Sequence, residues 1–220
     1  MNYILNIETA TKNCSVSLAR NGETILYKEI AEQGYSHAEK LHVFIEEILK
    51  ESQIDIKLLK AVAVSKGPGS YTGLRIGVST AKGLCYALGI PLIAVDTLAV
   101  LAQSVSQKNG LIVPMIDARR MEVYSAVFDH NHQKIKDVQA EILTENSYSE
   151  VTDTIYIVGD CQEKCQTVLT KPNFVFLSEK VFPSAQEMSV LSYAKFEQNL
   201  FEDVAYFEPF YLKDFMLNPK

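Results

Sequence analysis

The stretch SKGPGSYTGLRIG, residues 65–77, contains four glycines and directly follows the apolar run AVAV. Glycine-rich turns between a strand and a helix often bind phosphate through their backbone N–H groups. A Walker loop needs GxxxxGK[ST], but Leu74 stands five residues after Gly69 and no lysine adjoins it. The dinucleotide pattern GxGxxG also fails, because Thr72 occupies its third glycine position. The spacing therefore disfavours a tight phosphate site, although an anion could still lie at the helix N-terminus.

Nucleophilic chemistry also has little support. Ser70 and Thr72 precede a predicted helix, but the chain has no GxSxG elbow around them and no histidine nearby to act as base. We therefore expect both to be helix N-cap residues. The cysteines form no CxxC pair and lack the density of a secreted scaffold, which favours buried thiols: Cys14, Cys85, Cys161 and Cys165.

The histidines are too scattered to predict a metal site. His37 and His42 are five residues apart rather than the three or four that would place them on one helical face. His130 and His132 fall in a predicted hairpin turn, where a solvated loop is the simpler interpretation. We expect no metal.

Two acids, Glu8 and Asp117, each end an apolar predicted strand. Such a pair facing each other across a cleft could hold a magnesium nucleotide. However, the loop from Glu8 to Asn13 has no glycine that would let a phosphate approach its backbone. The preferred alternative is that both acids accept hydrogen bonds from hairpin amides. The candidate vestigial nucleotide cleft consists of Glu8, Thr9, Thr11 and Asp117.

The composition of the chain limits its partners. Among its 220 residues 47% are hydrophobic and 22% charged, and the net charge is −6. This balance argues against unaided nucleic-acid binding, which needs clustered basic side chains. One small basic spot, Arg119-Arg120 with Lys134 and Lys136, is interpreted as a solvated strand end rather than a tRNA track. The sequence has no apolar run of eighteen residues, and its first ten residues, MNYILNIETA, lack the basic region and cleavage site of a signal peptide. We therefore expect a cytoplasmic protein without membrane contact.

The first half of the chain predicts the element order βββαβαβα. Asn21-Gly22 indicates a hairpin turn, residues 36–39 (SHAE) form a capping box, and the helix that the glycine stretch opens is predicted to end near Leu88. Alternation and helical spacing predict strands at 3–8, 14–19, 24–30, 60–65 and 91–95, and a short helix at 98–105.

The second half repeats this order at an offset of about 109 residues, which aligns Glu8 with Asp117 and Asn21 with His130. Strands are predicted at 111–116, 121–128, after the turn at 130–133, at 154–159 and at 174–177. Helices are expected before and after the fourth of these strands and at 184–196. Two βββαβα lobes with mixed sheets describe a duplicated α/β fold of the actin-like, sugar-kinase-like (ribonuclease-H-like) kind. We expect lobes at 1–108 and 109–220, with the final segment free to pack back on the first lobe.

The helix opened by the glycine stretch is apolar over most of its circumference. At 100° per residue, Gly73, Gly77 and Ala81 share one stripe, with Leu84 and Leu88 beside it. Glycine in a helix interior costs about 1 kcal/mol relative to alanine, so these positions need a packing reason. One alternative is close packing on the protein's own sheet. The other, which we predict, is the close approach of a helix from a second polypeptide.

These residues carry a resemblance to a known family. GPGSYTGLRIG after a hydrophobic strand resembles the signature of the TsaB/TsaD superfamily, and IDARRMEVY (116–124) with EPFYL (208–212) resembles its TsaB (YeaZ) branch. The similarity covers nearly the whole chain, from ILNIETAT at 4–11 through SHAEKL at 36–41 to FEPFYLKD at 207–214. Glu8 departs from the family, which usually has aspartate there.

The resemblance implies a partner subunit without catalytic residues of its own, required for threonylcarbamoyladenosine formation on tRNA. It implies a homodimer when alone, a heterodimer with a TsaD-like catalytic subunit, recruitment of a TsaE-like ATPase, and contact with tRNA only through the complex. No cofactor is expected to be required, and weak ATP or ADP binding at a subunit interface is left open. The expected partner interface consists of Ser36, His37, Lys40, Leu41, Tyr71, Thr72, Gly73, Arg75, Ile76, Gly77, Thr80 and Ala81.

The alternative is an enzyme of the same fold, either a peptidase of the glycoprotease superfamily or a weak ATPase or kinase. TsaD-like enzymes carry NHxxGH after the strand that corresponds to residues 91–95, and its two histidines bind a metal. Here Thr97 and Leu101 occupy those two positions, and neither offers an imidazole ligand. The sequence therefore favours the partner subunit over the enzyme.

Overall fold

The computed structural model describes residues 1–31, 37–179 and 181–213 of the chain. The chain forms two compact units: one comprises Met1–Thr97 together with the segment that begins at Ser184, and the other is Leu98–Pro183. The predicted boundary between 108 and 109 is therefore wrong. Its physical reason is that Leu98, Leu101 and Val105 bury their side chains in a core of the second unit.

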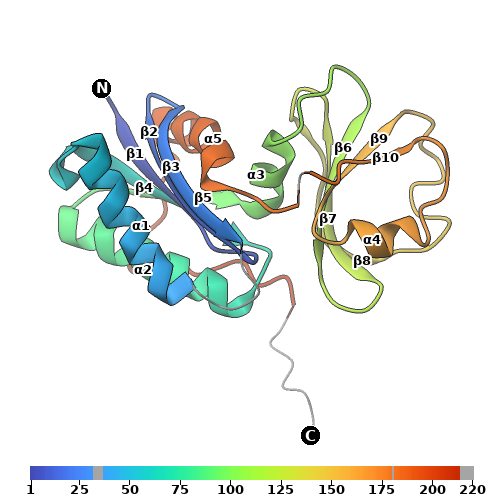
Figure 1. Ribbon diagram of the computed structural model, residues 1–220, viewed down its shortest axis with the longest axis horizontal. Helices are drawn as coiled ribbons and strands as arrows, with labels where there is room; N and C mark the ends of the chain where they lie inside the picture. Colours follow the sequence, from blue (N-terminus) through green and yellow to red (C-terminus); the bar gives the residue numbers. More distant parts are fainter. Residues whose placement is uncertain (32–36, 180, 214–220) are drawn as a thin grey trace, which may run out of the picture. The chain divides into compact units, whose positions relative to one another are not determined.

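The first unit is built on a five-stranded mixed sheet with the order β3-β2-β1-β4-β5 (Figure 1). Its strands are β1 (Tyr3–Glu8), β2 (Asn13–Arg20), β3 (Glu23–Ala31), β4 (Leu59–Gly67) and β5 (Leu92–Asp96). β1, β2 and β3 are antiparallel, whereas β4 and β5 run parallel to β1. All five strands were predicted from the sequence, and the left-handed Asn21-Gly22 pair (φ 51° and 87°) closes the β2–β3 hairpin as expected.

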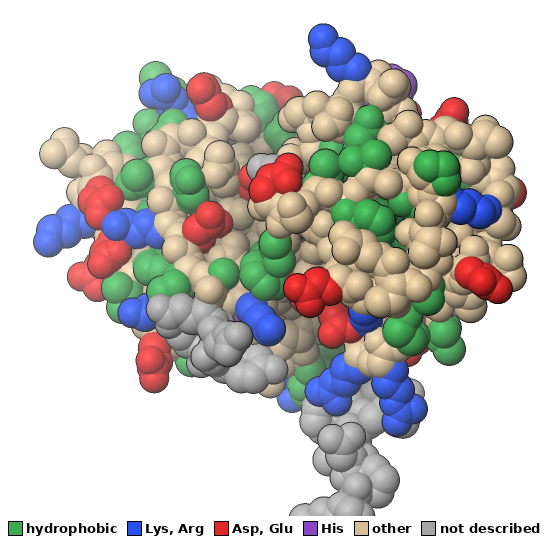
Figure 2. Space-filling model, turned by 45° about the vertical axis from the view of Figure 1, so that its right-hand side comes forward, with side chains coloured by type: hydrophobic (Ala, Val, Ile, Leu, Met, Phe, Trp, Pro, Cys, Tyr) green, Lys and Arg blue, Asp and Glu red, His purple; other side chains and the backbone are tan. Residues whose placement is uncertain are grey.

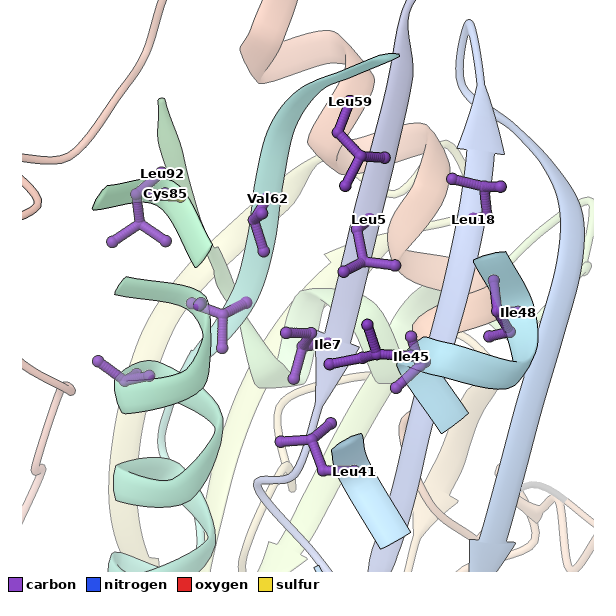
Figure 3. Close-up of a cluster of buried hydrophobic side chains, with 14 of the residues drawn as sticks. Leu5, Ile7, Leu18, Leu41, Ile45, Ile48, Leu59, Val62, Cys85 and Leu92 are labelled. Atoms are coloured by element: carbon purple, nitrogen blue, oxygen red, sulfur yellow. The ribbon is translucent and has the colours of Figure 1, made fainter. Parts of the chain in front are cut away.

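Three longer helices cover the two faces of this sheet. α1 (His37–Ser52) and α2 (Tyr71–Leu88) share a hydrophobic core with Leu5 and Ile7 of β1. Figure 3 shows this cluster, in which Leu41, Ile45 and Ile48 of α1 point toward the strands. Because side chains alternate along a strand, Asn6 faces the other side and bonds Ser189 of α5 (Ala185–Glu197). A 3-10 turn (Ile56–Leu58) leads into β4.

The ends of α2 lie where the sequence predicted them. Ser70 is the N-cap, and Gly89 terminates the helix in the left-handed conformation with φ 64°. The cap proposed at Ser36 for the first helix lies outside the described residues, and α1 begins at His37.

The second unit has a sheet of the same topology, β10-β9-β6-β7-β8. Its elements are α3 (Thr97–Gln103, whose first residue belongs to the first unit), β6 (Leu111–Asp117), β7 (Glu122–Asp129), β8 (Lys134–Ile142), β9 (Ile155–Gly159), α4 (Gln162–Gln166) and β10 (Phe174–Phe176). Glu8 and Asp117 both end the first strand of their units, which confirms the alignment at the 109-residue offset.

Two helices differ from the prediction for the second half. No helix joins β8 to β9, because the segment between them forms turns and buries too few apolar side chains, chiefly Leu143 and Tyr148, for an amphipathic helix. The last helix, α5, contacts β1, β2, β3 and β5 and so belongs to the first unit. The second unit therefore has the order αββββαβ, beginning with α3, and α5 occupies a face of the first sheet.

Candidate functional site

Gly69, Gly73 and Gly77 lie against the protein's own first-hairpin loop, the residues 9–12 that join β1 to β2. A methyl group added at any of these glycines would lie closer than 3.0 Å to this loop, against Ala10 at Gly69 and against Thr9 at Gly73 and Gly77. Cβ atoms in real proteins do not approach that closely. The prediction that this stripe faces a partner helix is wrong, and close packing within the chain explains it instead.

The N-terminus of α2 is capped by the same loop. The Ser70 amide donates to the Ala10 carbonyl at 2.6 Å, and the Ser70 hydroxyl accepts the Gly73 amide at 3.2 Å. The Thr9 hydroxyl donates to the Gly73 carbonyl at 2.8 Å. The N-cap role of Ser70 is thus confirmed. The same prediction for Thr72 is wrong, because Thr72 lies inside the first turn of α2 and is exposed. Two amides that an anion would need are already bonded within the chain.

Glu8 is fully buried at the base of this loop. One carboxyl oxygen accepts the Ala10 amide at 2.7 Å, and the other accepts the Ser65 hydroxyl. Burial raises the pKa of Glu8 to about 7, although these hydrogen bonds oppose the shift. Glu8 thus accepts a hydrogen bond from an amide of the hairpin loop, which was the preferred alternative to a nucleotide site.

The other candidate cleft residues also bond to their own units. Thr9 and Thr11 are buried, and the Thr11 carbonyl lies 2.7 Å from Nε2 of His37. Asp117, in the second unit, accepts the Arg119 amide at 2.9 Å and forms an ion pair with Lys164.

The predicted basic spot is not one patch. Arg119 and Arg120 lie in the turn before β7, whereas Lys134 and Lys136 pair with Phe128 and Val127 at the far end of that strand. Lys134 also forms an ion pair with Asp137 at 2.9 Å. The interpretation of the four residues as one strand end is therefore corrected.

The predicted interface residues fall into two groups. The inward group is buried in the first unit and consists of His37, Leu41, Gly73, Gly77 and Ala81. The outward group is exposed or half-buried and consists of Lys40, Tyr71, Thr72, Arg75, Ile76 and Thr80. Ser36 lies outside the described residues. Of the predicted interface residues that the structure describes, only the outward group can contact another polypeptide without opening the core.

The exposed side of α2, here called its outer face, consists of Thr72, Arg75, Ser79, Gly83, Tyr86 and Ala87. Four of these residues are small, and Tyr86 is 86% exposed. At Gly83 an added methyl group would meet nothing within 4 Å. The interface prediction did not include Ser79, Gly83, Tyr86 and Ala87, because the helical stripe was drawn through the inward-facing glycines. Their spacing with Thr72 at helical intervals was a signal that could have found them.

The C-terminal segment, residues 203–213, crosses α2. Lys82 donates to the carbonyls of Ala205 and Phe207 at 3.2 and 2.9 Å, and the Phe210 amide donates to the Lys66 carbonyl at 2.7 Å. The Arg75 guanidinium lies 4.0 Å from the centre of the Tyr71 ring, and its Nε donates to the Tyr211 hydroxyl at 3.1 Å. The closing FEPFYLK stretch thus contacts α2, the helix that the glycine motif begins.

Metal-ligating residues are not gathered in the described part of the chain: no three of its histidine, cysteine, aspartate and glutamate side chains come together. Thr97 and Leu101 are both fully buried, and the four cysteines are free and buried, as expected for the thiols. No described helix is long and apolar enough to cross a membrane.

Two units of one topology, each with a mixed sheet whose first strand ends in an acid, define a duplicated actin-like protein of α/β class. The chain belongs to the family described as TsaD, tRNA N6-adenosine threonylcarbamoyltransferase, whose model matches residues 26–218, and within it to the TsaB (YeaZ) branch.

The relatives support this assignment along most of the chain. It is 29% identical to the tRNA threonylcarbamoyladenosine biosynthesis protein TsaB of Escherichia coli, over 96% of this chain and 94% of that protein. It is 31% identical to TsaB of Buchnera aphidicola from Acyrthosiphon pisum, over 80% and 84%. A solved Pseudomonas aeruginosa protein, described as similar to peptidase YEAZ, superposes with a TM-score of 0.83 at 25% identity, over 97% and 100%.

Proposed function

We propose that this chain is a partner subunit, without catalytic residues of its own, in the formation of threonylcarbamoyladenosine on tRNA. In this role it binds a TsaD-like catalytic subunit and recruits a TsaE-like ATPase, and it forms a homodimer when alone. Similarity to TsaB proteins along most of their length supports the pathway. The chain would act in the cytoplasm, together with the tRNA that the complex modifies.

The observation that carries the partner role is Gly83. It lies inside the 18-residue helix α2, where glycine costs about 1 kcal/mol relative to alanine. Gly73 and Gly77 are explained by contact with Thr9, but nothing in the described chain approaches Gly83. The described residues therefore give no packing reason for it, and a close-packed helix of another polypeptide is a contact that small helical residues permit.

The rest of the outer face fits a docking surface. Thr72, Ser79 and Ala87 lie on the same side as Gly83 and are small enough for a helix to approach. Tyr86 supplies a large, exposed aromatic ring, a side chain enriched at the centre of interfaces. Arg75, the one charged residue of the outer face, adds a positive charge to it. We place both the homodimer contact and the catalytic-subunit contact here, so the two compete.

The absence of a catalytic role is supported by the site's own chemistry. Thr97 and Leu101 offer no imidazole where TsaD-like enzymes carry their histidines. Both carboxyl oxygens of Glu8 are bonded within the chain. We propose that the chain requires no cofactor, that any ATP or ADP binds weakly at a subunit interface, and that tRNA is engaged through the complex.

The test is Gly83→Leu, which adds bulk to the outer face at a position where the new Cβ would meet nothing within 4 Å. We expect the variant to fold normally, to sediment as a monomer, and to lose the TsaD-like subunit in pull-downs and threonylcarbamoyladenosine formation in a reconstituted reaction. Ala194→Leu is the matched control, because Ala194 is an exposed small residue on α5 of the same unit. Unchanged dimerisation and partner binding in Gly83→Leu would refute the placement of the interface.

A further inference from the structure

The turn between β6 and β7 contains two consecutive arginines in the left-handed conformation. Arg119 has φ 72° and Arg120 has φ 53°. This region is unfavourable for residues with a Cβ, and glycine or asparagine normally occupies it. The same chain uses Asn21 and Gly22, with φ 51° and 87°, at the β2–β3 turn. Gln53, His132 and Tyr148 also have positive φ, but each does so singly, whereas at this turn two adjacent residues with long side chains share the conformation.

The turn is held by hydrogen bonds beneath it. Lys164 donates to the carbonyls of Arg120 and Glu122 at 2.9 and 2.7 Å and forms an ion pair with Asp117. Asp117 also accepts the Arg119 amide at 2.9 Å. Lys164 and Asp117 neutralise each other, and the Asp160 carboxylate near the turn accepts the Asp117 amide at 2.8 Å.

Both guanidinium groups are available to a ligand. Arg119 and Arg120 are exposed, and neither side chain has a hydrogen bond or ion pair with any residue that the structure describes. Each guanidinium carries five N–H donors in a planar fork that matches the oxygens of a phosphate. Two adjacent forks on a braced turn are suited to two neighbouring anionic groups.

We propose that the Arg119–Arg120 turn binds phosphodiester groups of the tRNA backbone when the chain is in its complex. This inference rests on the proposed function, which supplies tRNA as the polyanion. A chain of net charge −6 can contact RNA only through a local basic site, and Lys134 and Lys136 lie at the opposite end of β7. The site is small, so it adds to tRNA binding by the complex and does not hold tRNA alone.

The test replaces the two side chains and keeps the turn. Arg119→Asn with Arg120→Gly introduces the residue pair that favours this backbone, so the variant should melt at or above the wild-type temperature. tRNA binding by the complex of this chain with the catalytic subunit is measured by fluorescence anisotropy at several salt concentrations. Each lost phosphate contact removes about 0.7–0.9 from the slope of log K against log salt. We expect a slope smaller by about 1.5 and roughly tenfold weaker binding at physiological salt.

Two further variants make the result specific. Lys108→Ala with Lys136→Ala removes the same charge from exposed sites near the other end of the sheet and should change binding much less. Arg119→Gln with Arg120→Gln removes the charge without introducing residues that favour the left-handed backbone. This variant should reproduce the loss of tRNA affinity and the smaller salt slope. Unchanged affinity and salt slope in both arginine variants would overturn the inference, as would lost assembly with the catalytic subunit, which would make the turn a protein contact. Failure of the wild-type complex to bind or modify tRNA would instead refute the proposed function.

Discussion

The clearest test of the two glycine environments is the same substitution, glycine to alanine, at two positions of α2. Gly73 and Gly83 are ten residues apart in one helix, and the change adds one methyl group in each case. At Gly73 that methyl would overlap the Thr9 carbonyl, whereas at Gly83 it would meet nothing within 4 Å. The two variants should therefore change stability in opposite directions.

The magnitudes follow from the contacts. Gly83→Ala should raise the free energy of unfolding by about 0.8–1 kcal/mol, because it removes the helix penalty of glycine without a clash. Gly73→Ala gains at most the same amount but must displace the first-hairpin loop. That loop is fixed by the bond from the Thr9 hydroxyl to the Gly73 carbonyl and by the bond from the Ser70 amide to Ala10. Overpacking of about 1–3 kcal/mol, together with strain in these bonds, leaves a net loss of about 1–2 kcal/mol.

The assay is urea unfolding followed by circular dichroism, with melting temperatures as a second measure. For a chain of this size, 1 kcal/mol shifts the melting temperature by about 2–4 °C, so Gly83→Ala should melt above and Gly73→Ala below the wild type. Gly77→Leu, which meets the Thr9 side chain and Val64, should melt lower still. A Gly73→Ala variant as stable as wild type, but unable to dimerise, would show that this stripe faces a partner and would refute the reasoning.

Two other predictions concern single side chains of the first unit. The pKa of Glu8 is raised from 4.5 to about 7 by burial, so the folded state retains a proton that the unfolded state loses between these values. Stability should therefore fall by about 3 kcal/mol as pH rises from 4.5 to 7 and then level off; Glu8→Gln should lack this fall in urea titrations at each pH, and a parallel pH curve would contradict it. Tyr211→Ala removes the partner of Arg75, so the Phe210 amide, bonded to Lys66, should exchange its hydrogen faster, while the β1 amides remain protected. Unchanged exchange at Phe210 would show that the C-terminal segment is held without this contact.

Patterns within a few residues were enough to predict most elements. Alternation located the strands of both sheets, and Asn21-Gly22 and Ser70 marked a turn and a cap because these residues favour the backbone required there. The glycine motif and the closing FEPFYL stretch indicated the family before any coordinates. These features depend on local backbone preference or on residue identity, and both can be predicted from the amino-acid sequence.

The tertiary structure alone decided what each face meets. The periodicity of α2 identified Gly73 and Gly77 as a close-packed stripe, but the atoms that require them, the carbonyl and hydroxyl oxygens, belong to Thr9, 64 residues before Gly73. Likewise, α5 has a helical sequence that cannot reveal which sheet it covers, and the hydrogen bond that the Asn6 side-chain amide donates to the Ser189 hydroxyl places it on the first unit. Helical spacing specifies that a face must be buried or approached closely. Which neighbour fills that face depends on contacts between distant segments, and these form only when the chain has folded.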